Sequence, residues 1–248
     1  FYTGRSHVLR SVVAGVLGEW DADMPGYSNV QGMYAYALEE CGEYAEAERW
    51  GREASARNPG GLWAIHSVAH VLEMQGRYAE GSKWLDYPAE HWAKKNFFKA
   101  HVWWHNALFS LAQEDFGKAL NIFDSELSSV NSDKYVDVSN QAALLKRLEI
   151  AGVDVGERWD ALAAHSETRI HDHILPFRDA HFCLALAADG RVDMARKQID
   201  SLFVFAREGD GWTAETTKSI LIPLCEAMIA YESGEYGKAC DILWPIRN

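Results

Sequence analysis

Histidines at helical spacing are the residues of this chain best suited to chemistry. His66 and His70 form one pair four residues apart, and His101 and His105 form a second pair with the same spacing. Residues four apart lie on one face of a helix, so each pair presents both imidazole rings in one direction. The step of 35 residues from His66 to His101 matches one unit of a helical-hairpin repeat of about 34 residues. If that repeat holds, the two pairs come from equivalent stretches of neighbouring hairpins and can face each other.

Imidazole rings gathered in this way suit either a metal ion or proton transfer. Zinc and similar divalent ions take three or four nitrogen, oxygen or sulfur ligands, and the sequence predicts His66, His70 and His105 as such ligands. The first pair lacks the glutamate of an H-E-x-x-H motif, so no general base is built into it. Without a metal, the rings could act as acids or bases, oriented by Glu39 or Glu73. The structural alternative is that each ring only hydrogen-bonds to its neighbours in a crowded interior.

A polar stripe is predicted along the concave face of the repeats, because the first helix of each hairpin lines that face in tetratricopeptide-like arrays. The expected ligand-binding residues share this stripe and are Tyr36, Glu39, His66, His70, Glu73, His101, Trp104 and His105. Gly32 is equivalent to His66 and leaves room either for a ligand or for close helix packing. A slip of one residue in the third repeat would turn His105 by about 100° toward the backing helix. The tryptophans of this region are either core or the wall of a ligand pocket; they are Trp63, Trp84, Trp92, Trp103 and Trp104.

A second group of polar residues occupies positions 171–181, with the sequence H-D-H-I-L-P-F-R-D-A-H. Its H-D-H resembles a ligand set, but it precedes a proline, and Asp172 is predicted to cap the helix that follows. Asp179 and His181 are two residues apart and should therefore point to different helix faces. A loop that folds over the groove could still contribute one histidine. Asp137 could either cap a helix or reach the histidine pairs, and we predict the cap.

The elements that must position these residues follow a hairpin repeat. The segment G-M-Y-A-Y-A-L-E-E-C-G-E-Y-A-E-A matches the tetratricopeptide pattern of a small-plus-aromatic first helix, a glycine turn, and then tyrosine and alanine. Similar turns recur, and no strand-type alternation competes with them. The prediction is an all-α, right-handed solenoid of about six hairpins in a single domain, 1–248. A leading helix at 1–20 precedes hairpins at roughly 28–60, 62–96, 101–131, 137–163, 174–206 and 214–246.

Composition narrows the classes of function. The net charge of −12 argues against a nucleic-acid partner, which requires a basic surface. No run of 18 apolar residues is present, so no membrane span is expected. The four cysteines, at 41, 183, 225 and 240, are scattered and contain no C-x-x-C pair, which favours reduced thiols in a cytoplasmic compartment. The first residues lack both a signal-peptide pattern and an initiator methionine, so we expect the chain to be cut from a longer one.

The chain resembles the tetratricopeptide repeat protein 38 family. The similarity is carried by W-A-I-H-S-V-A-H-V-L-E-M-Q-G-R, H-V-W-W-H-N-A-L-F, the long segment V-D-V-S-N-Q-A-A-L-L-K-R-L-E-I-A-G-V-D-V-G-E-R-W, D-H-I-L-P-F-R-D-A-H-F, and the closing I-L-W-P-I-R-N. The resemblance covers nearly all 248 residues. It implies an α-solenoid related to tetratricopeptide repeats and little about chemistry. It also implies further helices before Phe1 and a segment after Asn248.

Three functions remain open from the sequence. The first is a binding module whose His/Trp/Tyr/Glu-lined groove holds a small polar ligand, a peptide or a partner chain, including a second copy of this chain. The second is a histidine-based enzyme that acts on a small polar substrate, with or without a divalent metal such as zinc. The third is a purely structural protein-interaction scaffold.

Overall fold

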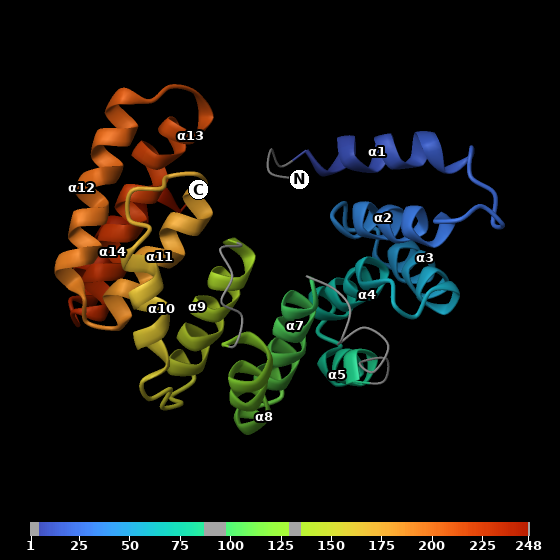
Figure 1. Ribbon diagram of the computed structural model, residues 1–248, viewed down its shortest axis with the longest axis horizontal. Helices are drawn as coiled ribbons and strands as arrows, with labels where there is room; N and C mark the ends of the chain where they lie inside the picture. Colours follow the sequence, from blue (N-terminus) through green and yellow to red (C-terminus); the bar gives the residue numbers. More distant parts are fainter. Residues whose placement is uncertain (1–4, 87–97, 129–134, 248) are drawn as a thin grey trace. The chain divides into compact units, whose positions relative to one another are not determined.

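The computed structural model describes residues 5–86, 98–128 and 135–247 (Figure 1). These residues form helices and connecting loops, with no strand among them, which confirms the all-helical prediction. The chain divides into two compact units, Phe1–Glu126 and Leu127–Asn248. Among the described residues, no helix combines the length and the apolar character needed to cross a membrane. The ends predicted for the second and third hairpins, 96 and 131, lie outside the described residues.

The first unit is a series of helices in which neighbours along the chain pack together. They are α1 (Ser6–Leu17), α2 (Tyr27–Glu39), α3 (Tyr44–Arg57), α4 (Leu62–Met74), α5 (Tyr78–Asp86), α7 (Lys99–Ala112) and α8 (Phe116–Ile122), which continues into a π-helical turn at Phe123–Leu127. Helix α4 contacts α2, α3, α5 and α7, and α7 also packs on α5 and α8. Helix α4, which carries His66 and His70, therefore packs directly on α7, which carries His101 and His105.

The turns that end α2 and α4 have the same construction. Gly42 and Gly76 adopt the left-handed φ values of 77° and 68°, which glycine tolerates because it has no Cβ. After α2, the Gly42 amide donates to the Glu39 carbonyl at 2.8 Å and the Glu43 amide donates to the Leu38 carbonyl at 3.0 Å. This is the Schellman pattern that satisfies the last helical carbonyls. The glycine turns predicted from the sequence at these two places are therefore helix ends in the structure.

Two glycines let the helices of the first unit approach closely. A Cβ added at Gly32 would lie 3.1 Å from the Ala64 Cβ, so Gly32 serves the close packing of α2 against α4 and leaves no room for a ligand. A Cβ at Gly81 would lie 2.4 Å from the Phe109 Cζ, which means that the Phe109 ring of α7 covers this point of α5. The apolar core at these crossings consists of Leu62, Ile65, Val68, Ala69, Leu72, Leu85, Val102 and Phe109. This packing determines how α4 and α7 face each other.

The second unit is also built from sequential helices. They are α9 (Tyr135–Ile150), α10 (Arg158–Glu167), α11 (Pro176–Ala188), α12 (Val192–Glu208), α13 (Gly211–Thr216), α14 (Ile222–Glu232) and α15 (Tyr236–Leu243). A π-helical turn, Thr217–Leu221, joins α13 to α14, and a short 3-10 helix, Trp244–Ile246, follows α15. Helix α11 contacts α9, α10, α12 and α14 and so forms the centre of this unit.

Candidate functional site

The two predicted histidine pairs come together in the first unit. His66 and His70 lie on α4, and His101 and His105 lie on α7, which packs against α4. The ring centroid of His66 lies 4.2 Å from that of His70, 4.9 Å from that of His101 and 5.0 Å from that of His105. One ligand atom from each of the four residues fits into a group in which all separations are within 4.8 Å. The helical phase predicted from the sequence therefore places all four imidazoles in one cluster.

Ring nitrogens of this four-histidine cluster face one another. The His101 Nε2 lies 3.0 Å from the His66 Nε2 and 3.2 Å from the His105 Nε2. Each imidazole nitrogen has one in-plane position, which holds either a proton or a lone pair. The single position on His101 Nε2 therefore faces two other nitrogens. The predicted ligand set of His66, His70 and His105 omitted His101, which the structure places between two of the others.

Two glutamates lie behind the cluster. The His105 Nδ1 donates to the Glu73 Oε2 at 2.9 Å, and this leaves the His105 Nε2 with its lone pair directed toward the other rings. The Glu39 Oε2 lies 3.4 Å from the His70 Nδ1 but has no hydrogen bond, although the Glu39 side chain is only 6% exposed. The His70 Nε2 and the His66 Nδ1 are also buried without a hydrogen-bond partner. Buried polar atoms without partners are costly, so the cluster as it stands is incompletely satisfied.

Burial favours the neutral form of the central rings. It lowers the pKa of His66 well below its ordinary value of 6.5, and the neighbouring charges of His70, His105 and His101 lower it further. The pKa of His105 is also lowered well below 6.5, again by burial first and then by His70. Neutral imidazole has a free lone pair and is the form that binds metal ions.

Aromatic rings enclose the four-histidine cluster. The Tyr36 ring is stacked 5.8 Å from His66, and the Trp104 ring is stacked 5.5 Å from His101. Phe98, which the sequence analysis missed, lies 5.0 Å from His66 and 4.9 Å from His101. Trp63 also contacts His66 and is 39% exposed. Every residue of the predicted polar stripe thus lies in or beside the cluster; Trp92 lies outside the described residues.

The second polar group predicted from the sequence forms a separate arrangement in the second unit. His173 contacts both Asp179 and Ser201, and His171 contacts the same serine. The predicted cap role of Asp172 is wrong: Leu175 precedes α11 as its N-cap, and no side chain caps the helix. The Asp172 carboxylate instead accepts a hydrogen bond from Arg178 at 3.0 Å.

The predicted cap role of Asp137 is also wrong. Asp137 is the third residue of α9 and is buried, so it is not the residue that precedes the helix. The His181 Nδ1 donates to the Phe177 carbonyl at 2.7 Å and does not share a partner with Asp179. This agrees with the prediction that Asp179 and His181 point to different faces of their helix.

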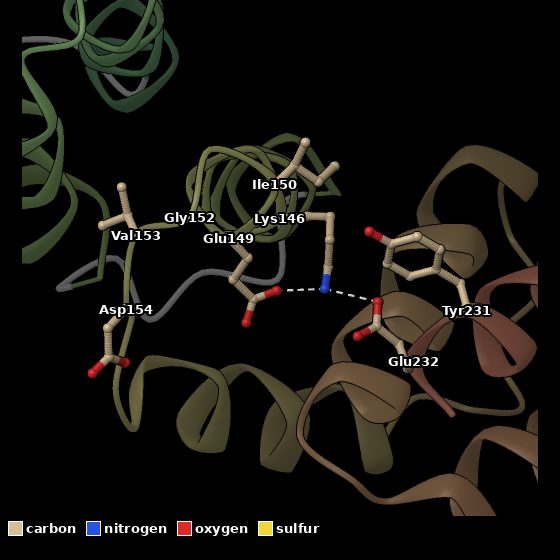
Figure 2. Close-up of a pocket in the computed structure, with 8 residues that line it drawn as sticks. All are labelled: Lys146, Glu149, Ile150, Gly152, Val153, Asp154, Tyr231 and Glu232. Atoms are coloured by element: carbon tan, nitrogen blue, oxygen red, sulfur yellow. Dashed lines mark hydrogen bonds and ion pairs between the residues drawn. The ribbon is translucent and has the colours of Figure 1, made fainter. Parts of the chain in front are cut away.

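An open pocket of about 450 Å³ lies elsewhere in the second unit, and Figure 2 shows the residues around it. The Lys146 ammonium lies between the carboxylates of Glu149 and Glu232, with 2.7 Å to the Glu232 Oε1. Burial alone would lower the pKa of Lys146, but hydrogen bonds to the two carboxylates outweigh this and raise it. Lys146 is therefore a charged, paired ammonium rather than a free amine nucleophile.

The donor atoms of the four-histidine cluster determine what it could hold. Four neutral imidazoles suit zinc, copper, nickel or ferrous iron and suit calcium or magnesium poorly, since those ions prefer oxygen. Two carboxylates lie at the outer nitrogens of the cluster, as is usual around metal-binding histidines.

No protein-family model and no solved structure matches this chain.

Proposed function

We propose that this chain binds a divalent transition-metal ion, zinc by preference, through the ring nitrogens of His66, His70, His101 and His105. The observation that carries the proposal is the contact of the His101 Nε2 with two other Nε2 atoms, at 3.0 and 3.2 Å. Zinc–nitrogen bonds of about 2.0–2.1 Å at tetrahedral angles place ligand nitrogens about 3.3 Å apart. These two separations are close to this value, and the remaining ligand-atom separations are within 4.8 Å, so a shift of the rings toward a common point would accommodate an ion.

Hydrogen placement supports a metal ion over a purely hydrogen-bonded cluster. The His105 proton is on Nδ1, where Glu73 accepts it, so the Nε2 atom can only accept. A proton on the His101 Nε2 could be directed at His105 or at His66 and would leave the other contact without a good hydrogen bond. A cation at the common point of these nitrogens would use all of the lone pairs together. The His70 Nε2, which is buried without a partner, supplies a fourth donor.

Two nearby carboxylates would balance the charge of the bound ion. Four neutral imidazoles leave the +2 charge of the ion uncompensated, and the carboxylates of Glu39 and Glu73 lie one ring away from it. Carboxylates at this distance increase the basicity of the ligand imidazoles and hold their orientation. The nearly buried Glu39 Oε2, which has no hydrogen bond, is accounted for if a cation is bound in front of His70.

A site with four protein ligands is coordinatively closed, as structural zinc sites are. It would join α4 to α7 by two ligands from each helix. We therefore assign the ion a stabilising role. The His70 side chain is 24% exposed and is therefore more accessible to solvent than that of His105, which is 4% exposed. Exchange of this ligand for water is the step that a catalytic role, the alternative function, would require.

We also infer that the helices belong to a tetratricopeptide-like solenoid related to the tetratricopeptide repeat protein 38 family, with this metal site in its groove. The Schellman turns at Gly42 and Gly76 support this, because they end α2 and α4 at equivalent positions of successive hairpins. The partly exposed Trp63, beside the cluster, supports binding of a small polar ligand or a peptide there. Comparison of small-ligand and peptide binding with and without zinc, alongside the zinc titration described next, tests whether the region beside Trp63 binds a ligand.

The metal proposal is tested by titration of chelator-treated protein with zinc against a competing chromophoric chelator. We expect one equivalent to bind and His101→Ala to weaken binding at least about 100-fold, since removing even an outer-shell partner costs 10- to 100-fold. The matched control is His7→Ala, which removes an exposed histidine of α1. Circular dichroism checks that the variants fold, and His101→Gln replaces the alanine variant if it does not. Unchanged stoichiometry and affinity in folded His101 variants would overturn the proposal.

A further inference from the structure

A carboxylate, an imidazole and a hydroxyl contact one another in series in the second unit. The Asp179 Oδ1 lies 3.3 Å from the His173 Nδ1, and the His173 Nε2 lies 2.8 Å from the Ser201 Oγ. Asp179 belongs to the first turn of α11, His173 to the loop that precedes it, and Ser201 to α12. This is the order of groups that activates a serine hydroxyl in acyl-transfer enzymes, which is recognised by geometry rather than by sequence position.

The proton positions follow from the chemistry of the three groups. A carboxylate can only accept, so the His173 Nδ1 carries a proton and donates it to Asp179. The His173 Nε2 then has a lone pair and accepts the hydroxyl proton of Ser201. The His171 Nδ1 also lies 2.8 Å from the Ser201 Oγ, and it donates to the oxygen whose own proton is already engaged. In this arrangement each of the three contacts has its own proton, and His173 is the base.

The positions of the base and its carboxylate are firmly held. The side chains of Asp179 and His173 are 1% and 7% exposed. The Gln198 side chain donates to the Asp179 carbonyl at 2.9 Å, and the His173 ring packs 5.3 Å from Phe205. The backbone of His173 has a φ of +45°, in the left-handed region that residues with a side chain seldom adopt. Such strain persists only where surrounding contacts maintain it, and it gathers at functional sites.

Two apolar side chains that neighbour this group along the chain are exposed. His171 is exposed, and Ser201 is half-buried. Ile174 follows the base in the loop and is 70% exposed, and Val204, one turn after Ser201 on α12, is 45% exposed. An apolar acyl chain bound beside the hydroxyl would cover these two side chains.

We propose that Ser201 is the nucleophile of an esterase site, with His173 as general base, Asp179 as the positioning residue, and carboxylic esters with a short apolar acyl chain as substrates. Ser201 lies inside a helix, where the backbone amides are already hydrogen-bonded, so they do not form an oxyanion hole. The His171 Nδ1, which is next to the attacking oxygen, donates instead to the carbonyl oxygen as it becomes negative.

Each step of this reaction balances. The Ser201 Oγ bonds to the acyl carbon while its proton passes to the His173 Nε2, and the alcohol oxygen then leaves with that proton. Water next gives a proton to His173 and bonds to the acyl carbon, and the Ser201 Oγ leaves and recovers the proton. The sum is ester plus water to acid plus alcohol, with no oxidant or reductant.

The test uses the full chain with p-nitrophenyl butyrate. We expect turnover with an acyl adduct on Ser201, located by peptide mass spectrometry, and at least about a 100-fold loss of kcat in Ser201→Ala and His173→Ala, because general-base catalysis contributes that much or more. The matched control is Ser219→Ala, which removes an exposed serine of the same unit and leaves the rate unchanged. For Asp179→Asn, kcat falls while KM stays the same, since the carboxylate orients the base without touching the substrate.

Two outcomes overturn this proposal. The first is turnover that persists in folded Ser201→Ala, or an adduct on another residue. The second is activity that a chelator or His101→Ala removes, because it would then belong to the four-histidine cluster. Should Ser201→Ala fail to fold, labelling of the unchanged protein with a fluorophosphonate decides: an adduct on Ser201 supports the proposal, and no adduct there overturns it.

Discussion

The two histidine groups of this chain differ in what their ring nitrogens face. In the four-histidine cluster of the first unit, the His101 Nε2 faces two nitrogens. In the second unit, the nitrogens of His171 and His173 face a hydroxyl and a carboxylate. Contacts between nitrogen and oxygen can each be satisfied by one proton, whereas several lone pairs directed at one another call for a shared cation. We therefore propose metal binding by this residue type in one unit and proton transfer by it in the other.

Carboxylates have different roles in the two groups for the same reason. Glu73 accepts the outer proton of His105 and leaves the inner lone pair available to a metal ion. Asp179 accepts the outer proton of His173 and leaves the inner lone pair available to the Ser201 hydroxyl. In both groups a carboxylate fixes the proton on the Nδ1 atom. The group that faces the free Nε2 lone pair therefore decides the chemistry.

The largest expected effect is a difference between the two units in how zinc changes their hydrogen exchange. A ligand that binds only the folded state at 1,000 times its Kd adds about 4 kcal/mol of stability. Zinc should therefore slow hydrogen exchange of the α4 and α7 amides by up to about 1,000-fold while α11 and α12 stay the same. Hydrogen-exchange mass spectrometry with and without zinc measures this, with His101→Ala as the variant that abolishes the effect. Equal protection of α11 and α12 would contradict the assignment of the ion to the first unit.

The next effect comes from displacing α7. Gly81→Ala places a Cβ where the Phe109 ring lies, 2.4 Å from its Cζ, and overpacking of this kind costs about 1–3 kcal/mol. We expect a lower free energy of unfolding in urea together with weaker zinc binding, since α7 carries two of the ligands. Gly237→Ala is the matched control, because nothing lies within 4 Å of its added Cβ. Phe109→Leu should recover part of the loss, and no recovery would show that the ring is not the obstacle.

A smaller effect is expected from the outer carboxylate. Glu73→Gln keeps the size of the side chain but lowers its ability to accept the His105 proton, so zinc affinity should fall about 10- to 100-fold. The zinc competition titration measures this, with Glu19→Gln, an exposed residue, as its control. If Glu73→Gln and Glu19→Gln bind zinc equally well, the Glu73 contact does not tune the site.

The sequence was informative where helical phase decides the outcome. His66, His70 and His105 were predicted as one ligand set because four-residue spacing and the hairpin repeat fix their face. His101 was left out of that set because the register of the third repeat was uncertain, and a slip of one residue turns a side chain by about 100°. Helical phase alone could not decide whether His101 is a metal ligand or only hydrogen-bonds to its neighbours in the interior.

Other features depend on tertiary contacts that no spacing rule encodes. The approach of Ser201 to His173 requires both the packing of α12 and the left-handed backbone at His173. The cap predicted at Asp172 failed because Arg178, in the first turn of α11, binds that carboxylate instead. The glycine turns were predictable because only glycine tolerates that backbone without cost.

The smallest effect is the pH dependence of the metal-free protein. Burial holds the pKa of His66 and of His105 below 6.5 in the folded state, while in the unfolded chain both stay near 6.5. Below pH 6.5 the unfolded state therefore binds more protons, and the free energy of unfolding falls as pH falls. The limit is about 1.4 kcal/mol per pH unit for each ring, and above about pH 7.5 the contribution is complete.

Urea titrations of metal-free protein between pH 7.5 and 5.5 measure this slope, and His66→Gln should reduce it because glutamine does not titrate. An unchanged slope in folded His66→Gln would show that His66 does not gain protons on unfolding. Zinc sharpens the experiment, because zinc and protons compete for the same lone pairs. Added zinc should therefore move acid unfolding of the first unit to lower pH, by an amount that grows with zinc concentration.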